Sequence, residues 1–197
     1  MKRIGIFGGT FDPIHIGHLI AAEQVLYHTK LDEIWFMPAS KPPHKLDMKI
    51  TAVHHRVEMV RRVISLDPRY HICTIELDRK GPSYSLDTVK ELKKKYPNYS
   101  FFFIIGGDMI EYLAKWHGIE ELIEIVEFIG LKRPGFSFQP KNEQEQKIFG
   151  RIQLIPMLQL EISSSRIREW INKGRTVRYL VPSSVEEYIK ENGLYEG

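Results

Sequence analysis

Residues 3–18 read RIGIFGGTFDPIHIGH, and this stretch decides the fold. Residues 3–7 form an apolar run of strand length that ends in Gly8-Gly9, and a helical pattern follows from residue 18 to residue 28. Asp12-Pro13 favours a turn between the two. A short buried strand that passes through glycines into a helix is typical of a βαβ unit, and such units build parallel sheets.

The rest of the chain repeats this alternation. Apolar runs predict strands at 33–38, 70–77, 100–105, 127–132 and 151–155, and helical patterns lie at 52–64, 86–96, 119–125, 166–172 and 184–191. We therefore expect an α/β fold of the Rossmann-like, doubly wound kind, with a mainly parallel sheet and helices on both faces. Ligands of such sheets bind beyond the carboxyl ends of the strands, so the segments after the strands are the ones to search.

Residues 40–49 and 134–145 are polar or rich in proline and predict surface loops. No internal repeat and no low-complexity linker divides the chain. The sequence therefore predicts a single domain over 1–197, with a small C-terminal helical part from about residue 163.

The composition excludes several classes of protein. A chain of 197 residues with 43% hydrophobic content can bury one substantial core, and its formal net charge of +3 is no general nucleic-acid signature. The single cysteine, Cys73, rules out an internal disulfide and lies in an apolar stretch typical of a buried thiol. No run suits a signal peptide or a membrane span, so we expect a cytoplasmic protein without nucleic-acid or membrane partners.

The turn after the first strand has the features of a phosphate site. Gly8 and Gly9 lack Cβ atoms and let a ligand approach the backbone. The following helix directs its positive end and its free N–H groups to the same place. His15 and His18 are three residues apart, which on a first helical turn places both imidazoles on one face. Gly17 between them is a poor helix former, which indicates that something passes close to the backbone there.

Other interpretations of this turn stay open. It could be a plain connection with surface histidines, or Asp12, His15 and His18 could hold a metal ion, although no further ligand at metal spacing accompanies them. A dehydrogenase fingerprint needs three glycines at fixed spacing, which Gly8-Gly9-Thr10 does not supply.

A second candidate anion site follows the last predicted strand. Ser163, Ser164 and Ser165 precede Arg166 and Arg168 at the start of a helical pattern. A helix N-terminus with serine hydroxyls and a guanidinium can cradle an anion. The alternative is an ordinary capped helix with two solvated arginines.

Residues 8–18 resemble the nucleotidyltransferase superfamily, whose signature is His-x-Gly-His behind the first strand, here His15-Ile16-Gly17-His18. Members also carry a Ser-Ser-Thr/Ser-x-Ile-Arg stretch that holds the triphosphate, and Ser165 and Arg168 fill its Ser/Thr and Arg positions. The stretches KPPHK at 41–45, PSYSLDT at 82–88 and GGDM at 106–109 with Lys115-Trp116 are similar to the bacterial nicotinate mononucleotide adenylyltransferase family. The resemblance spans residue 2 to about residue 190.

The resemblance implies a reaction and its participants. An enzyme of this family transfers AMP from ATP to nicotinate mononucleotide and yields deamido-NAD and pyrophosphate. Both substrates are small molecules, Mg²⁺ arrives bound with ATP and keeps waters as its main ligands, and no metal site made by the protein is expected. A homo-oligomer is left open.

The resemblance also implies roles for individual residues. The catalytic set is His15, His18, Lys41, His44 and Arg168. The ATP-binding set is Gly8, Gly9, Thr10, Phe11, His15, His18, Gly106, Asp108, Ser165, Ile167 and Arg168. The acceptor-binding set is Ser85, Met109, Tyr112, Trp116 and His117.

Some of these assignments have plain alternatives. The family more often has Thr at positions 85 and 165, but Ser keeps the hydroxyl. Trp116 could be a core residue, Asp108 could cap a helix, and Lys41 and His44 could be solvated. Another small-molecule nucleotidyltransferase, such as a phosphopantetheine adenylyltransferase or a cytidylyltransferase, is the nearest competing enzyme. A non-catalytic nucleotide sensor on the same fold is the competing class.

Overall fold

The computed structural model describes residues 1–40, 50–77, 79, 84–132, 138–158 and 160–196. Its centre is a six-stranded sheet formed by β1 (Lys2–Gly9), β2 (Glu33–Pro38), β3 (Tyr70–Ile72), β4 (Tyr99–Gly106), β5 (Glu127–Lys132) and β6 (Ile152–Pro156). The strand order is β3-β2-β1-β4-β5-β6, and every neighbouring pair is parallel. This order confirms the doubly wound α/β fold.

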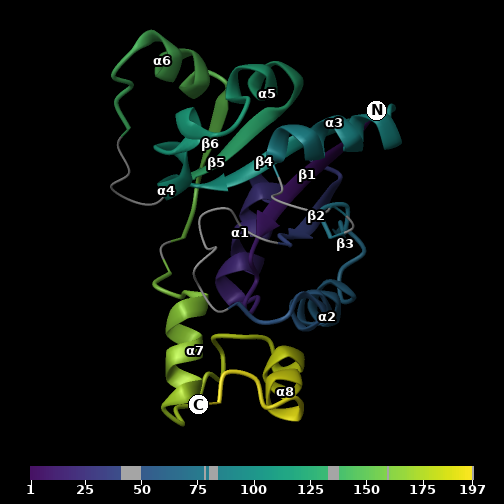
Figure 1. Ribbon diagram of the computed structural model, residues 1–197, viewed down its shortest axis with the longest axis vertical. Helices are drawn as coiled ribbons and strands as arrows, with labels where there is room; N and C mark the ends of the chain where they lie inside the picture. Colours follow the sequence, from purple (N-terminus) through teal and green to yellow (C-terminus); the bar gives the residue numbers. More distant parts are fainter. Residues whose placement is uncertain (41–49, 78, 80–83, 133–137, 159, 197) are drawn as a thin grey trace.

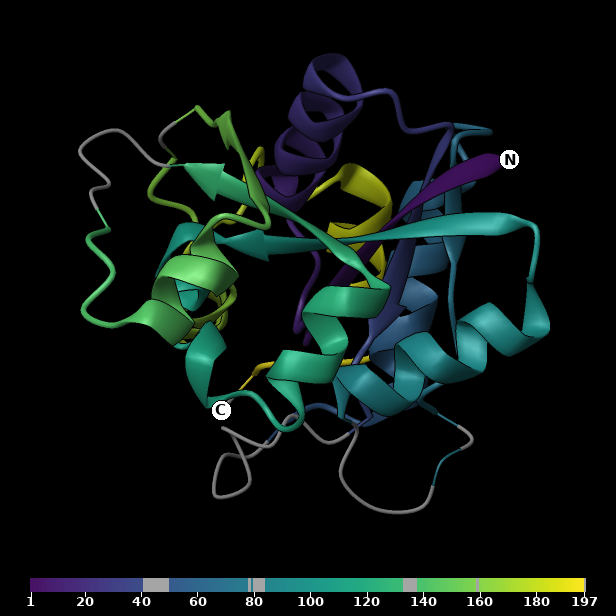
Figure 2. The same ribbon diagram turned by 90° about the horizontal axis from the view of Figure 1, so that it is seen from above.

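Helices cover both faces of the sheet (Figures 1 and 2). The helices α1 (Ile16–His28) and α2 (Val53–Ile64) pack on one face, and α3 (Ser85–Lys95), α5 (Ile119–Ile125) and α6 (Glu143–Phe149) pack on the other. The core between the sheet and α1 and α2 is called the α1-face core, and the core between the sheet and α3, α5 and α6 is called the α3-face core. Side chains alternate along each strand, so Phe7 enters the first core and Ile6 enters the second. Both cores are apolar, which explains why the central strands read as continuous hydrophobic runs.

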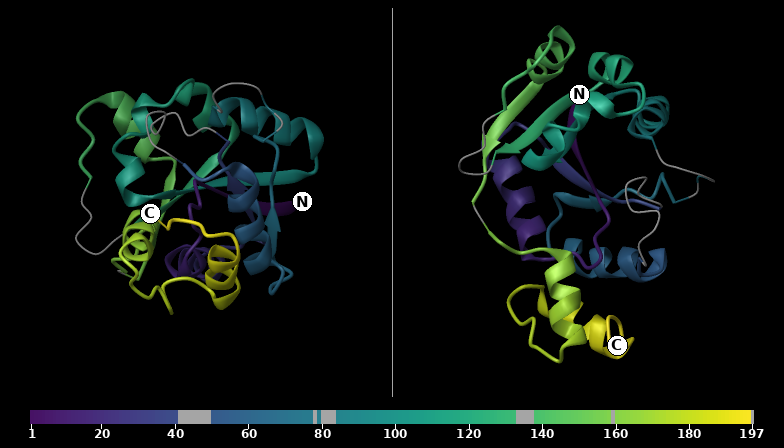
Figure 3. Two further views of the ribbon diagram at one scale, coloured as in Figure 1. Left: turned by 60° about the horizontal axis from the view of Figure 1, so that its bottom comes forward. Right: turned by 60° about the vertical axis from the view of Figure 1, so that its left-hand side comes forward.

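After β6 the chain forms α7 (Ser164–Asn172) and α8 (Ser183–Glu191), which lie together at one end of the molecule (Figures 1 and 3). Helix α8 packs against α2, and its residues Val185 and Ile189 join the α1-face core. The N–H of Ile16 donates to the carbonyl of Leu180 at 3.0 Å. The segment between α7 and α8 therefore contacts the first residue of α1.

The third strand is shorter than the expected 70–77. It ends at Ile72; the N–H of Cys73 still donates to the carbonyl of Phe36 at 2.8 Å, and the chain then turns, with the N–H of Leu77 donating to Thr74 at 2.8 Å. Cys73 is a free, buried thiol, as expected, and Ile75 packs against the same α3-face core. The apolar run at 70–77 therefore reflects residues that stay buried after β3 ends, and not a strand that continues to pair with β2.

The expectation of a loop over 134–145 is wrong at its C-terminal end, because α6 begins at Glu143. The Asn142 side chain accepts a hydrogen bond from the N–H of Glu145 at 2.8 Å, and the Glu145 carboxylate accepts from the N–H of Lys141 at 2.7 Å. Ile148 is the one residue of this helix with a buried side chain, so its polar composition hid it.

Two further short elements were not expected. They are α4 (Gly107–Ile110) and the 3₁₀ turn η2 (Leu113–Lys115). Both are too short to produce a helical period in the sequence. No helix in the part of the chain described above combines the length and apolar character needed to cross a membrane.

Candidate active site

The turn after β1 lies where the strand order reverses. β1 pairs with β2 on one side and with β4 on the other. Its carboxyl end is Gly8-Gly9, and the carboxyl end of β4 is Gly106, where an added Cβ would meet nothing within 4 Å. Ligands of doubly wound sheets bind at this switch point.

Phe11 shapes the turn. Its φ of 49° is left-handed, and its buried ring packs edge-on against Phe7 and His18, with centroids 5.9 and 5.0 Å apart. A Cβ at Gly9 would lie 2.8 Å from this ring. Glycine at position 9 therefore makes room for Phe11, and Phe11 supports His18.

The imidazoles of His15 and His18 stack, with ring centroids 3.7 Å apart. His15 is the N-cap residue of α1, and its backbone N–H donates to Nδ1 of His18 at 3.2 Å. Because Nδ1 of His18 accepts this hydrogen bond, neutral His18 carries its proton on Nε2.

His15 is 7% exposed, and burial lowers its pKa to about 4. Its ring is therefore neutral near pH 7. A Cβ at Gly17 would lie 3.0 Å from Nδ1 of His15. The close approach expected at Gly17 thus comes from the neighbouring histidine ring.

Helix α7 brings the second candidate anion site to the first turn. The Arg168 Nη1 donates to the carbonyl of Asp12 at 2.7 Å, and its Nη2 donates to Oγ of Ser165 at 3.3 Å. The hydroxyl of Ser164 donates to the carbonyl of Pro13 at 2.9 Å. Two segments about 150 residues apart in the chain therefore form one cationic, hydroxyl-rich corner.

The remaining residues of this stretch have other contacts. Ser163 caps α7 by accepting from the N–H of Arg166 at 3.2 Å, and the Arg166 guanidinium donates to the carbonyl of Glu161 at 3.3 Å. Ile167 is fully buried in the α1-face core, and its N–H donates to the carbonyl of Ser163 at 3.0 Å.

Asp12 is buried at 2% exposure and is held from several sides. Its Oδ1 accepts from the hydroxyl of Tyr195 at 2.8 Å, and its Oδ2 accepts from the N–H of Thr51 at 3.3 Å. The Arg168 Nη1 lies 3.9 Å from Oδ2. The carboxylate is thus engaged by protein groups on both oxygens.

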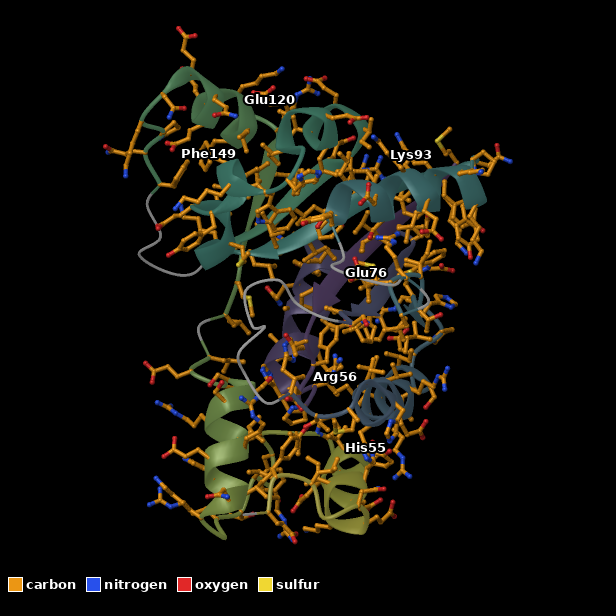
Figure 4. The ribbon with its side chains drawn as sticks, in the orientation of Figure 1. His55, Arg56, Glu76, Lys93, Glu120 and Phe149 are labelled. Carbon is orange, nitrogen blue, oxygen red and sulfur yellow. The ribbon has the colours of Figure 1, made fainter. Side chains whose placement is uncertain are left out.

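Arg56 of α2 lies 1% exposed beneath the same turn, and Figure 4 labels it at the level of α2. Its Nη1 donates to the carbonyls of Thr10 and Ala39 at 2.7 and 2.9 Å, its Nε to Thr51 at 3.0 Å and its Nη2 to Ser40 at 3.4 Å. Burial lowers the pKa of Arg56 and the charge of Asp12 raises it, with burial the larger effect.

A second group of expected residues meets beyond β4. The rings of Tyr84 and His117 lie with centroids 4.5 Å apart, which places the start of α3 and therefore Ser85 beside His117. Trp116 packs edge-on against Phe103, with centroids 5.9 Å apart. This packing agrees with the core alternative for one side of the Trp116 ring.

Two more expected acceptor residues lie on the same side. Met109 is partly buried against the α3-face core, and Tyr112 is exposed, with Nζ of Lys115 5.4 Å from the centroid of its ring. Gly118, with φ 65°, lies against α3, and a Cβ there would approach Cδ2 of Leu86 to 2.4 Å.

Some expectations fall outside the described residues. Lys41 and His44 lie there, and so does the side chain of Asp108, whose backbone is in α4. Within the described ranges, no group of three or more His, Cys, Asp or Glu side chains is arranged to hold a metal ion. The three-residue metal alternative with Asp12, His15 and His18 therefore finds no support there.

Sequence reasoning missed Arg56 and Tyr195, and it considered Asp12 only as a turn residue and as a possible metal ligand. Arg56 left one signal, because it lies on the apolar stripe of α2 together with Val57, Val60 and Val63, where a charge is out of place. Tyr195 left none, since its partner is 183 positions away.

Comparisons with known proteins show which proteins the chain is similar to. The model of the cytidylyltransferase-like family matches residues 6–170. The nicotinate-nucleotide adenylyltransferase of Bacillus subtilis (strain 168) is 48% identical over 196 residues, which cover 100% of both chains.

Solved structures give the same result. Plasmodium falciparum nicotinic acid mononucleotide adenylyltransferase complexed with NaAD superposes with a TM-score of 0.80 at 27% identity, covering 99% of this chain and 98% of that chain. The same Plasmodium protein complexed with APC gives a TM-score of 0.78 at 27% identity and the same coverage.

The buried His15 predicts a loss of stability in acid. Between pH 6.5 and 4 the unfolded chain binds a proton that the folded chain refuses, so stability falls as the pH falls through this window. The pKa of about 4 predicts that His15 accounts for about 2 kcal/mol of the loss between pH 7 and 4.5. Urea unfolding of His15→Asn should show a correspondingly smaller pH dependence. Exposed His28→Asn should behave like the parent, and equal slopes for all three proteins would contradict the burial argument.

Gly118 predicts a second measurable effect. Gly118→Ala combines a left-handed φ with a Cβ 2.4 Å from Leu86, whereas Gly174, also at φ 65°, has open space around its Cβ. Gly174→Ala should lose about 1 kcal/mol of unfolding free energy for conformation alone. Gly118→Ala should lose a further 1 to 3 kcal/mol, roughly, for overpacking. Thermal unfolding measures both losses. Equal losses of unfolding free energy in Gly118→Ala and Gly174→Ala would show that Leu86, at the start of α3, moves aside without a measurable cost.

Proposed function

The chain belongs to the cytidylyltransferase-like family, and we infer from this premise that it transfers AMP from ATP to nicotinate mononucleotide with release of pyrophosphate. It is a nucleotidyltransferase that acts in NAD biosynthesis. One observation carries the chemistry: Arg168 and Ser164 hydrogen-bond to Asp12 and Pro13 at the switch point of the sheet. This joins the stacked histidines and the cationic end of α7 into one candidate triphosphate site.

The reaction places simple demands on the protein. A phosphate oxygen of the mononucleotide bonds to the α-phosphorus of ATP, the bond from that phosphorus to the β-phosphate oxygen breaks, and pyrophosphate leaves with the electron pair. A phosphate monoester is largely dianionic near pH 7, so the attacking oxygen needs no protein base. Catalysis then depends on alignment and on stabilising the charge that develops on the phosphates.

His15 and His18 are assigned to the α- and β-phosphate oxygens. The tautomer of His18 leaves Nε2–H as its donor, because Nδ1 is occupied by the N–H of His15. Neutral His15 supports the same pocket by stacking on His18. The Ile16 N–H is already used by Leu180, so the phosphate donors of this turn are the imidazoles and the remaining N–H groups.

Ser165 and Arg168 are assigned to the distal phosphates. Among the described residues, Arg168 makes one hydrogen bond through Nη1, to Asp12, and one through Nη2, to Ser165. A guanidinium carries five N–H donors in all. Lys41 and His44 are proposed to join the phosphates, and Gly8, Gly9, Thr10 and Phe11 form the turn beneath them. Backbone near Gly106 and Ile167 is proposed for adenine, with Asp108 for the ribose.

Nucleotidyltransferases of this type generally use a divalent metal ion with ATP. We propose Mg²⁺, which keeps water ligands and binds through substrate phosphates more readily than through a protein cage. The ion would neutralise phosphate charge, while the residues of this chain orient the triphosphate.

The acceptor side is assigned to Ser85, Trp116 and His117, with Met109 and Tyr112 beside them. The contact between Tyr84 and His117 holds the first turn of α3 near the turn that follows Trp116. The Ser85 hydroxyl and the His117 N–H would face the pyridine carboxylate, and Trp116 would stack on the ring.

His18 is open to a test that separates its two ring nitrogens. His18→Asn keeps an acceptor near Nδ1 but loses the Nε2 donor, and it should lower kcat by about 100-fold or more. His18→Gln places an N–H near Nε2 and should retain more of the activity. The measurement is kcat for pyrophosphate release at saturating substrates. Near-normal turnover of His18→Asn would exclude the assigned role.

The acceptor assignment predicts discrimination between an acid and its amide. A carboxylate can only accept hydrogen bonds, whereas an amide brings an NH₂ group that needs an acceptor. We expect kcat/KM for nicotinate mononucleotide to exceed that for nicotinamide mononucleotide at least about tenfold, with Mg²⁺ and saturating ATP. Trp116→Ala should raise KM for both, and Ser85→Ala should mainly reduce the ratio.

Pyrophosphate release with ATP and each mononucleotide is the measurement, and the reaction with EDTA in place of Mg²⁺ is the negative control. Equal efficiency with both acceptors would contradict the nicotinate assignment. Release with neither acceptor would contradict the proposed function.

A further inference from the structure

Tyr195 makes a contact that the proposed chemistry leaves unexplained. Its hydroxyl donates to Oδ1 of Asp12 at 2.8 Å, across 183 positions of sequence. The residue lies after α8 with φ 67°, in the left-handed region that tyrosine rarely adopts. Such a conformation persists where surrounding contacts determine it.

The hydroxyl of Tyr195 is suited to act as a permanent donor. Burial raises its pKa, and the charge of Asp12 raises the pKa further, so the group stays protonated at all working pH values. The ring packs against the α1-face core, and the N–H of Leu194 donates to the carbonyl of Ile189 at 3.0 Å. The tyrosine is therefore fixed by α8 while its hydroxyl reaches Asp12.

Asp12 passes this constraint to Arg168 in two ways. Its backbone carbonyl accepts from Nη1 of Arg168 at 2.7 Å, and its carboxylate Oδ2 lies 3.9 Å from the same nitrogen. With Oδ1 held by Tyr195 and Oδ2 by the N–H of Thr51, the carboxylate cannot rotate away from the guanidinium without losing hydrogen bonds.

We propose that Tyr195 is a positioning residue for ATP, which acts through Asp12 to hold the Arg168 guanidinium toward the triphosphate. This inference rests on the phosphate role proposed above for Arg168. It assigns to the segment after α8 a part in substrate binding, in addition to the packing of Leu194 and Tyr195 against the α1-face core.

Tyr195→Phe tests the proposal because it keeps the ring and removes only the hydroxyl. Loss of a hydrogen bond to a charged, buried group should raise KM for ATP about tenfold. KM for nicotinate mononucleotide and kcat should change less than about twofold, since uniform loss of binding leaves turnover intact. If the role of Tyr195 were purely structural, Tyr195→Phe would lower the midpoint of thermal unfolding without raising KM for ATP selectively.

Tyr188→Phe is the matched control. It removes a hydroxyl from the same C-terminal helices, where Tyr188 meets Nδ1 of His55 at 2.9 Å and has no hydrogen bond to Asp12 among the described residues. We expect its KM for ATP to equal that of the parent. A matching increase in Tyr188→Phe would assign the effect to loosened helices and overturn the proposal.

A double-mutant cycle with Arg168→Lys identifies the route. If Tyr195 acts through Arg168, then Tyr195→Phe should weaken ATP binding less than about twofold in the Arg168→Lys background. If the double variant lost ATP binding by the product of the two single-variant factors, or if Tyr195→Phe alone left KM for ATP unchanged, the proposal would be overturned.

The dissociation constant for MgATP, measured by calorimetry without an acceptor, supplies the same cycle independently of turnover. The coupling between Tyr195 and Arg168 can therefore be measured even if the acceptor is not nicotinate mononucleotide. Coupling in MgATP binding without pyrophosphate release would support the Tyr195 inference while contradicting the proposed function.

Discussion

Arg56 carries a charge into the interior and satisfies it with backbone carbonyls from three segments. Thr10 belongs to the turn after β1, Ala39 and Ser40 follow β2, and Thr51 precedes α2. An unpaired buried guanidinium would be costly, so these segments keep their places relative to one another. The turn after β1, the end of β2 and the start of α2 consequently share one donor group.

Asp12 is the second buried charged residue of this arrangement. Its carboxylate balances the buried charge of Arg56 and lies near Arg168, while its carbonyl holds Arg168 directly. A single aspartate thus connects α2, the turn after β1 and α7. This explains why a residue of a glycine-rich turn is itself 2% exposed, although turns usually lie at the surface.

The two halves of the candidate site are built differently. The half proposed for the phosphates rests on buried charges and on hydrogen bonds between distant segments, which fix directions closely. The half proposed for the acceptor rests on aromatic packing of Trp116 on Phe103 and of Tyr84 on His117, and on the close approach of Gly118 to Leu86.

The sequence by itself determined the parallel sheet and pointed to the turn after β1 as the candidate site. Alternating apolar runs predicted the six strands, and Gly8-Gly9 followed by His15 and His18 singled out that turn, because period and turn chemistry are local properties. Helix α6 escaped because its one buried side chain gives no period. Only the tertiary structure decided how Arg56 and Tyr195 serve the turn. Their partners are carbonyls and a carboxylate up to 183 positions away, and no local pattern encodes a hydrogen bond that forms only when distant elements pack together.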